Sequence, residues 1–559
     1  MIINIISIKS TKKNHLLLKI SFLILLFCNI FSIKNYKNEK EIINIAVVGS
    51  GFSGSSVSYF LLKEFERLKD THHLNITIFE KKNNLTDNNL RSEEIQEQVI
   101  EVGIPFVFDW QINLKKLLKE FSMNLIKFNA TESIGIFNKQ EFLVEEKNKD
   151  FMDKLKIQYP QDMQILISLI KKFHKALQGT LSKSENKLIF ENLESFIETF
   201  KEDFSDYKDL DLERADEYLN NLEMKLSFID KIISAILNSN LNQGTETTIL
   251  SSLLTILSQL NNKYSVEEGI YKLLNHMTIG SHNYQRNLFV KYNCEVKYVI
   301  PEESYKRNPN PNPNSSKKKY TLEYKEEGNN FSTTSETFDF VILNNRIVLK
   351  GGFEIKDSSI SKDIMKNLIR SEIEYKMIYN HIFIGNLQSE FFLNKTIDKE
   401  ENIEEFYTNN DKYSSELILI NNNQGLKEFN MITPFCKHCF INRKFESNNL
   451  AFNSMFRISS SLDRLHLLYN ENLFDGHYYY ENQTGFGRRR FKNEVLFNNP
   501  KGREKKPSIV ISKGLYNNRA FDFIDENLEF KVISSKNIAS LIVKNYLKED
   551  DLGLISIDF

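Results

Sequence analysis

The clearest pattern of apolar and polar positions lies between residues 42 and 82. Residues Ile43–Val48 are apolar except for one asparagine, as in a short strand that is buried on both faces. From Val57 to Leu68, apolar side chains recur every three or four positions, which predicts a helix with one buried face. A second short apolar run, Leu74–Lys82, predicts another strand. Strand, turn, helix and strand within about 40 residues make one βαβ unit of a parallel sheet.

The period of the pattern changes several times farther along the chain. Residues 151–282 repeat their apolar positions every three or four residues, so we expect them to be mostly helical. Strands are expected again after residue 288, and residues 353–500 mix short strands and helices without a clear period. The other expected elements are a strand and turn at 99–108, an amphipathic helix at 112–125, a buried strand at 338–345, a strand and turn at 507–518, and a long helix at 526–547.

The turn after the first strand has the pattern G-x-G-x-x-G, which is read from Gly49, Ser50, Gly51, Phe52, Ser53 and Gly54. The first glycine permits a tight turn, the second lets a pyrophosphate approach the main chain, and the third lets helix and strand pack closely. The N–H groups at the start of the helix then face the anion. Glu80 ends the next strand, where its carboxylate can bind ribose hydroxyls. Glycines kept for packing alone are the alternative to a dinucleotide site.

The nature of Glu80 and the length of the chain distinguish among dinucleotides. An acidic residue at this place disfavours the ribose 2′-phosphate of NADP. A compact NAD domain is usually complete within about 150 residues. Here a sheet strand (338–345) and a terminal strand and helix return very late in the chain. A discontinuous flavin domain requires such a return, and we therefore expect FAD.

These elements predict an α/β protein with a discontinuous FAD-binding Rossmann-type domain of the GR2 type. A second, α+β substrate domain is rich in helices. We expect the FAD-binding domain to comprise residues 43–135, 265–350 and 505–548, and the substrate domain to comprise 136–264 and 353–504. The stretch 306–319 alternates Asn with Pro before a lysine run, which predicts a disordered loop at the tip of a hairpin.

The chain of 559 residues has a net charge of −1, which gives no reason to expect a nucleic-acid partner. Lysines precede an apolar stretch at 16–33, and a polar segment follows it, so residues 1–33 resemble a secretory signal peptide. An uncleaved signal anchor is the alternative. Sequons such as Asn129, Asn394 and Asn482 are consistent with a glycoprotein of the secretory pathway.

A cysteine pair and a basic stretch each have a possible functional role, but a simpler explanation is favoured for both. Cys436 and Cys439 have the spacing of a redox motif, but no thioredoxin-like pattern surrounds them and no other metal ligands lie at short spacing. A local disulfide or two unreactive thiols is the expected outcome, and no metal is expected. The basic stretch at 488–490 suggests peripheral contact with an anionic membrane, and a solvated loop is the alternative we favour. No catalytic triad is found, and the oligomeric state is open.

Four blocks of the sequence carry a resemblance to the prenylcysteine oxidase family. They are "INIAVVGSGFSGSSVSYFL", "IEVGIPFVFDWQINLKKLLKEF", "GIYKLLNHMTIGSHNYQRNLFVKYNCEVKYVI" and the terminal "PSIVISKGLYNN…ENLEFKVISSKNIASLIV". Their order and spacing are similar to those of the family. The resemblance implies that the glycines of the turn bind the diphosphate and that Glu80 binds the adenosine ribose. It also implies that Arg91 and Gly103 lie near the cofactor, that Val296 meets the adenine, and that Glu529 lies beside the ribityl end.

The resemblance further implies the chemistry. Hydride would pass from C1 of a farnesyl or geranylgeranyl chain on cysteine to N5 of FAD. Water would add to the resulting thiocarbenium ion, which would collapse to an aldehyde and free cysteine. Oxygen would then reoxidise the flavin and form hydrogen peroxide. The expected partners are therefore a prenylated cysteine and O2, and the expected location is lysosomal, vacuolar or extracellular.

The sequence departs from the family pattern where the main chain should approach the cofactor. The glycine pair before Arg91 is replaced by Asn88 and Asn89, and Ile104 replaces a glycine. The strand ending at Asn345 lacks the usual small-residue finish, and the terminal turn reads "NNRAFDFIDEN". Two alternatives follow: another FAD-dependent oxidase of the amine-oxidase type, and a non-catalytic family member that binds lipid or a partner.

Overall fold

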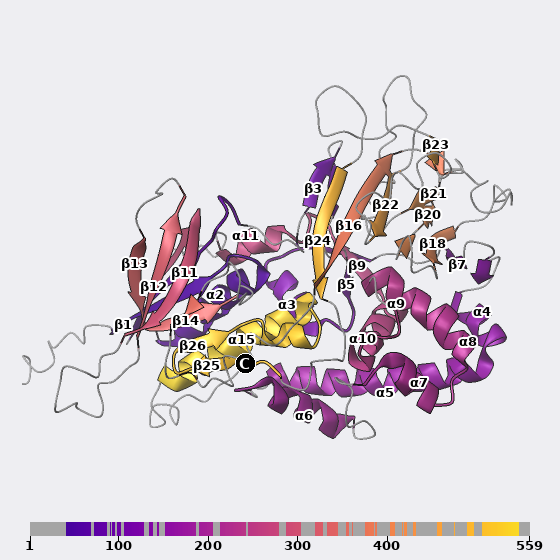
Figure 1. The fold of residues 1–559 in the computed structure, drawn as a ribbon, viewed down its shortest axis with the longest axis horizontal. Coiled ribbons are helices and arrows are strands. Elements are labelled where there is room, and N and C mark those ends of the chain that lie inside the picture. Colours follow the sequence, from indigo (N-terminus) through magenta and orange to yellow (C-terminus); the bar gives the residue numbers. More distant parts are fainter. Residues whose placement is uncertain are drawn as a thin grey trace, which may run out of the picture.

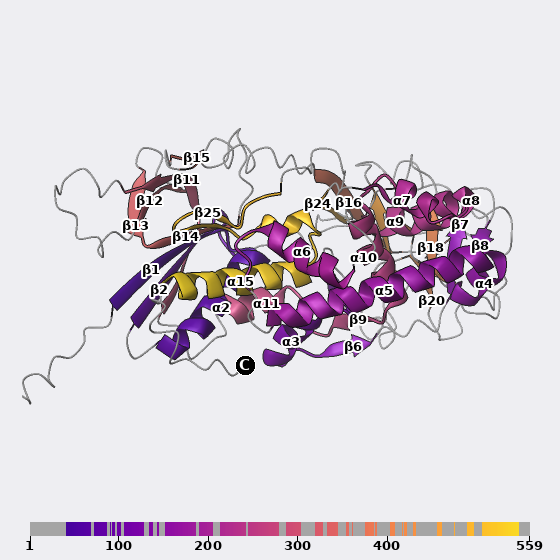
Figure 2. The same ribbon diagram turned by 90° about the horizontal axis from the view of Figure 1, so that it is seen from below.

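The computed structural model describes residues 41–127, 133–344 and 506–546 with short gaps, and mainly the strands within 345–505. Side chains are described chiefly within 41–90, 106–127, 152–344 and 506–546. Figures 1 and 2 show an elongated molecule with two ends. One end holds a six-stranded sheet with helices and a smaller sheet, and the other holds a seven-stranded sheet beside a block of helices.

The βαβ unit predicted from the sequence is confirmed. Strand β1 (Glu41–Val48) pairs in parallel with β2 (His72–Phe79), and helix α2 (Phe52–Phe65) connects them, followed by one 3-10 turn at Glu66–Leu68. Ile43, Ile45 and Val47 are fully buried on one face of β1, and Ala46 and Val48 on the other. Burial of each large apolar side chain contributes about 1.5–3 kcal/mol, which explains why an unbroken apolar run becomes a central strand.

Three separate segments of the chain build the six-stranded sheet. Its order is β10-β2-β1-β14-β26-β25, and all pairs are parallel except β25 with β26. The additional strands are β10 (Leu288–Lys291), β14 (Phe340–Leu343), β25 (Val510–Ser512) and β26 (Leu515–Asn517). Helices α2, α11 (Lys272–Thr278) and α15 (Leu528–Tyr546) pack together on one face. The domain is therefore discontinuous, as the late return of the strand pattern indicated.

A four-stranded sheet covers the other face in the order β13-β12-β11-β15. Its strands are β11 (Cys294–Pro301), β12 (Tyr320–Glu326), β13 (Thr334–Phe338) and β15 (Glu354–Ile355). Strands β11 and β12 form an antiparallel hairpin that starts from the pair Pro301 and Tyr320. The predicted loop at 306–319 lies almost entirely outside the described residues, but the hairpin that carries it is confirmed.

The strand predicted at 338–345 is in fact two strands in two sheets. It divides at Asp339, where β13 ends and β14 begins. Asp339 donates its N–H to the Asn44 carbonyl oxygen at 2.8 Å, and its carboxylate accepts the Asn44 N–H at 2.9 Å. An apolar run cannot reveal such a bend, because Phe338 ends one strand, Phe340 begins the next, and only the pairing of Asp339 with Asn44 separates them.

Besides α11, the predicted helical region contains eight helical segments within its described residues. They are α4 (Phe151–Gln158), α5 (Pro160–Glu185), α6 (Leu193–Asp203), α7 (Ala215–Asn221), α8 (Leu226–Phe228), a π-helical turn at Ile229–Ile233, α9 (Ser234–Leu241) and α10 (Ile249–Leu260). The helical prediction is wrong at β9 (Lys263–Val266), which pairs with β5 (Val107–Phe108) and β6 (Leu125–Lys127). The helix predicted at 112–125 likewise ends early, because α3 (Ile112–Glu120) stops before β6. Cross-strand pairing overrides the helical period at both places.

The seven-stranded sheet has the order β24-β16-β22-β19-β18-β7-β8, and helix α9 packs against β18 and β19. Its strands are β7 (Ser133–Phe137), β8 (Phe142–Val144), β16 (Tyr375–Ile384), β18 (Ile403–Thr408), β19 (Glu416–Leu417), β22 (Met455–Ser460) and β24 (Arg489–Leu496). Smaller pairs are β3 (Ser92–Ile95) with β4 (Gln98–Glu101), β17 (Asn386–Leu387) with β23 (Phe474–Asp475), and β20 (Leu419–Asn421) with β21 (Phe429–Met431).

Two predictions need correction, and two others lie outside the described residues. The boundary predicted between 135 and 136 falls inside β7, which belongs to the seven-stranded sheet. Part of the basic stretch at 488–490 lies in the edge strand β24 rather than in a loop. The predicted signal peptide and the pair Cys436 and Cys439 lie outside the described residues. Of the helices that are described, none has the length and hydropathy required to cross a membrane.

Candidate functional site

The glycine turn joins β1 to α2 with almost no free space. Gly49 has φ 97°, a conformation that only glycine adopts without strain, and its N–H donates to the Phe79 carbonyl oxygen at 2.8 Å. A Cβ placed on Gly54 would lie 1.9 Å from the Gly49 carbonyl oxygen and 3.4 Å from Nδ2 of Asn344. Both positions therefore require glycine, the first for the turn and the last for contact between helix and strand.

Helix α2 begins at the carboxyl edge of the sheet, directly after β1. The strand order changes direction at β1, because later strands were added on both of its sides. Strand β1 has β2 on one side and β14 on the other. Open parallel sheets bind their ligands at such a point, outside the carboxyl ends of the strands. The Ser55 N–H donates to the Gly51 carbonyl oxygen at 2.9 Å, and the N–H groups before it belong to the first turn, where no helical carbonyl precedes them. This helix end is suited to a phosphate anion.

Glu80 directly follows β2, and its side chain lies against the glycine turn. One carboxylate oxygen accepts hydrogen bonds from the Ser50 N–H at 2.9 Å and from the Ser50 hydroxyl at 2.6 Å. The other oxygen accepts the Lys82 N–H at 2.9 Å. The side chain is 7% exposed. These contacts hold the carboxylate rigidly against the glycine turn, at the place where an adenosine ribose would lie.

Strand β11 lies next to Glu80 and carries Val296. The Cys294 N–H donates to the Glu80 carbonyl oxygen at 2.8 Å, and Val296 follows two residues later with 6% exposure. The ladder between β11 and β12 shifts register between Val296 and Tyr298. The structure thus brings the predicted adenine contact to the same end of the sheet as the predicted ribose contact.

A charged pair and a tyrosine connect the strands beside Glu80. Lys291 on β10 forms an ion pair with Glu336 on β13, and the Tyr324 hydroxyl donates to Glu336 at 2.6 Å. Burial, followed by the hydrogen bond to Glu336, raises the pKa of Tyr324 to about 12. The hydroxyl therefore remains a donor at any physiological pH, and the cluster fixes β10 against the second sheet.

The terminal segment closes the site on the side of β14 and β26. Asn518 follows β26 and is 1% exposed. Its Nδ2 donates to the Ser53 carbonyl oxygen at 2.9 Å, to Oδ1 of Asn344 at 2.8 Å and to the Ser535 hydroxyl at 3.2 Å. Asn344 in turn donates its N–H to the Val48 carbonyl oxygen at 3.1 Å. One carboxamide thus links the first turn of α2, the end of β14 and helix α15.

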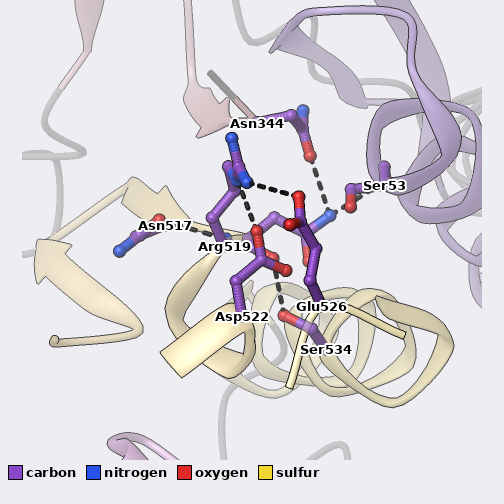
Figure 3. Close-up of polar contacts among 8 residues, drawn as sticks. Ser53, Asn344, Asn517, Arg519, Asp522, Glu526 and Ser534 are labelled. Carbon is purple, nitrogen blue, oxygen red and sulfur yellow. Dashed lines mark hydrogen bonds and ion pairs between the residues drawn. The ribbon is translucent and has the colours of Figure 1, made fainter. Parts of the chain in front are cut away.

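Figure 3 shows Arg519 between Asp522 and Glu526. The Arg519 Nε lies 2.5 Å from Asp522, and its Nη2 lies 3.3 Å from Glu526. The Ser534 hydroxyl donates to the Asn518 carbonyl oxygen at 2.9 Å, which fastens this turn to helix α15. The charged terminal turn is therefore an internally paired unit at the edge of the site.

Glu529 lies in the last helix, as expected, and its carboxylate faces the start of α3. It is fully buried, and its carboxylate accepts the Asn113 N–H at 3.0 Å, the Asn113 side-chain amide at 2.8 Å and the Leu114 N–H at 2.8 Å. These are the first N–H groups of α3, so Glu529 caps that helix from α15. Burial raises its pKa, and the hydrogen bonds from Leu114 and Asn113 act in the opposite direction. All of its described hydrogen bonds go to α3, and the ribityl contact stays a prediction.

The predicted site residues thus fall into three groups. Gly49, Ser50, Gly51, Phe52, Ser53, Gly54, Glu80 and Val296 lie together at the carboxyl edge of the sheet, Glu529 lies at the start of α3, and Arg91 and Gly103 lie outside the described residues. The sequence analysis missed Asn344 and Asn518. Their signal was a polar residue directly after a buried strand, which the Asn-rich composition obscured. Among the described residues, no group of side chains suits a metal ion.

The observed residues fit a dinucleotide. A tight glycine turn, a helix start at the carboxyl edge and a buried acid at the end of the next strand occur together. The diphosphate would lie at the first turn of α2, the adenosine ribose at Glu80, and the second half of the cofactor on the side of β14 and β26. Asn518 adds a buried amide oxygen without a partner on that second side.

Comparison with known proteins identifies the family. A family model described as prenylcysteine lyase matches residues 158–552, well over half of the 559 residues. The chain belongs to the prenylcysteine lyase family. Mouse prenylcysteine oxidase 1 is 21% identical over 252 residues, which make up 44% of this chain and 47% of the mouse protein. Human prenylcysteine oxidase 1 is 20% identical over 242 residues, or 40% of this chain and 43% of the human protein. The matched region spans less than half the length of these relatives.

Solved structures confirm the predicted fold class. Putrescine oxidase, in a structure of the wild type bound to putrescine, aligns over 90% of this chain and 99% of its own, with a TM-score of 0.53 and 11% identity. Cyclohexylamine oxidase from Brevibacterium oxydans IH-35A aligns over the same shares, with a TM-score of 0.52 and 8% identity. At such identity the likeness shows the fold alone, which is that of the Rossmann-type flavoproteins. Flavin amine oxidases of this fold and the prenylcysteine oxidase family bind FAD, in agreement with the cofactor expected from the sequence.

Proposed function

We propose that this protein is an FAD-dependent oxidase that cleaves the thioether of a prenylated cysteine. The reaction consumes the thioether, O2 and one water, and yields the cysteine thiol, a prenyl aldehyde and hydrogen peroxide. Membership of the prenylcysteine lyase family supports the substrate class. The observation on which the cofactor depends most is the glycine turn with Glu80 at the carboxyl edge of the sheet.

The protein's own residues hold the cofactor rather than perform the chemistry. When bound, FAD supplies a hydride acceptor that oxygen can regenerate. The first turn of α2 receives the diphosphate, where helix N–H groups favour negative charge. Glu80 accepts hydrogen bonds from the ribose, and the Ser50 and Lys82 N–H groups hold its carboxylate in place. No described side chain acts as a general base in this proposal.

The test begins with the absorption spectrum of the full chain produced in a eukaryotic secretory host. Bound flavin gives peaks near roughly 375 and 450 nm. Peroxide release is then measured with farnesylcysteine, with putrescine and with S-propylcysteine, a thioether without the allylic C1. We expect peroxide and a stoichiometric thiol from farnesylcysteine alone. Peroxide from putrescine alone would make the protein an amine oxidase. A folded, colourless protein that takes up no added FAD would indicate a non-catalytic family member.

We also propose that the protein acts in the secretory pathway, in a lysosome, a vacuole or outside the cell. The lysines and apolar stretch before residue 33 and the sequons support this location. Peripheral membrane contact would suit a prenylated substrate that partitions into lipid, and the arginines at the start of β24 lie on an edge strand. Treatment of the cell-derived protein with a glycosidase should lower its apparent mass, and an unchanged mass together with cytosolic fractionation would contradict the location.

A further inference from the structure

The oxygen of the Asn518 side chain has an unusual environment. Oδ1 is buried and has no hydrogen-bond partner among the described residues, although Nδ2 of the same carboxamide has three. The orientation of the amide is fixed, because the Ser53 carbonyl oxygen can only accept a hydrogen bond and must therefore face the nitrogen. A buried acceptor without a donor costs about 1–3 kcal/mol, so its retention requires an explanation.

The position of Asn518 indicates what kind of donor would satisfy this oxygen. Asn518 contacts the first turn of α2, where the anion-binding N–H groups begin, through the Ser53 carbonyl oxygen. It also contacts the end of β14 through Asn344. Glu80 lies on the opposite side of β1, at the end of β2. A dinucleotide whose adenosine ribose is at Glu80 must place its other half on the Asn518 side of the diphosphate. In FAD, the group next to the diphosphate on that side is the ribityl chain, which carries hydroxyl donors.

We propose that Oδ1 of Asn518 accepts a hydrogen bond from a ribityl hydroxyl of bound FAD. This inference rests on the proposed function, since it takes FAD as the ligand. It gives the second half of the cofactor a contact in this chain, whereas the described hydrogen bonds of Glu529 all go to α3. No described group of the chain donates to this oxygen, so we assign the donor to the ligand.

Two ligands and two variants test the assignment. FAD and ADP share the diphosphate and the adenosine ribose, but only FAD has the ribityl chain. For Asn518→Ala, calorimetry should show FAD binding weakened about tenfold and ADP binding within twofold of the wild type. The matched control is Ser534→Ala, which removes the hydroxyl bonded to the main-chain carbonyl oxygen of Asn518 and leaves the side-chain amide in place. It should leave both affinities within twofold.

The first part of a third measurement uses only the wild-type protein, so it does not depend on the folding of any variant. An FAD analogue whose ribityl hydroxyls are replaced by hydrogen should bind the wild-type protein about tenfold more weakly than FAD, and Asn518→Ala should not discriminate between the two ligands. Equal losses for FAD and ADP in Asn518→Ala, or no loss for either, would overturn the assignment. A different result would refute the proposed function itself: a wild-type protein that does not bind FAD.

Discussion

Substitution of Gly54 by alanine tests the geometry of the glycine turn most directly. The added Cβ would lie 1.9 Å from the Gly49 carbonyl oxygen, about 1.5 Å closer than the ordinary contact limit of 3.4 Å. The obstructing atom belongs to the main chain, so no side-chain rotation relieves the contact. Helix α2 must move away from the turn, and overpacking of this kind costs up to about 3 kcal/mol.

Alanine also stabilises a helix interior relative to glycine by about 1 kcal/mol, which offsets part of this cost. The expected net loss is about 2 kcal/mol, or roughly 30-fold in the ratio of folded to unfolded protein. The helix start would move with α2, so FAD binding should weaken by more than the tenfold expected for the loss of one hydrogen bond.

Urea unfolding and FAD titration measure the two effects, and Gly244→Ala is the matched control. There the added Cβ would lie 2.4 Å from a carboxylate oxygen of Glu246, the far end of a flexible side chain that can rotate away. We expect Gly244→Ala to change the free energy of unfolding by less than about 1 kcal/mol and to leave FAD binding unchanged. If Gly54→Ala were as stable as this control and bound FAD equally well, the close contact between Gly54 and the Gly49 carbonyl oxygen would not require glycine.

Two further substitutions test the buried acids Glu80 and Glu529. Glu80→Gln should weaken FAD and ADP binding equally, about tenfold each by calorimetry, because both ligands carry the adenosine ribose; a loss confined to FAD would contradict this placement. Glu529→Gln should lower the free energy of unfolding by about 2 kcal/mol in urea melts, because an amide group would then face the N–H donors of α3. Burial raises the pKa of Glu529 in the folded state above its ordinary value of 4.5. At a pH between 4.5 and the raised pKa, the folded protein therefore keeps a proton on Glu529 that the unfolded chain has released. Stability should therefore fall as pH rises through this window in the wild type relative to Glu529→Gln, and identical pH profiles would refute the assignment.

The sequence predicts local structure well where one period persists and both partners of a contact lie close together. The strand predicted from Ile43 ends at Val48 as expected, and the second strand is observed as His72–Phe79. The glycine turn and Glu80 are separated by one helix, so their contact follows from the βαβ geometry. The bend at Asp339 and the capping of α3 by Glu529 involve partners hundreds of residues apart. No periodicity encodes such pairs.

The departures of the terminal segment from the family pattern have a physical explanation that leaves room for a cofactor. The turn after β26 lies close to the helix start that would receive an anion. It contains Asp525, whose carboxylate accepts two hydrogen bonds from Asn527, and two further carboxylates, Asp522 and Glu526. Isolated carboxylates there would repel a diphosphate. Arg519 instead binds both, at 2.5 Å and 3.3 Å, and Asp522 is only 1% exposed (Figure 3). The cluster keeps a residual charge of −1, but its charges face one another rather than the first turn of α2. At the first turn of α2, the Ser53 carbonyl oxygen accepts hydrogen bonds from the amide nitrogen of Asn518 and from the hydroxyl of Ser535. Both are neutral, so at Ser53, where α2 begins, the substituted segment adds hydrogen-bond donors and no negative charge.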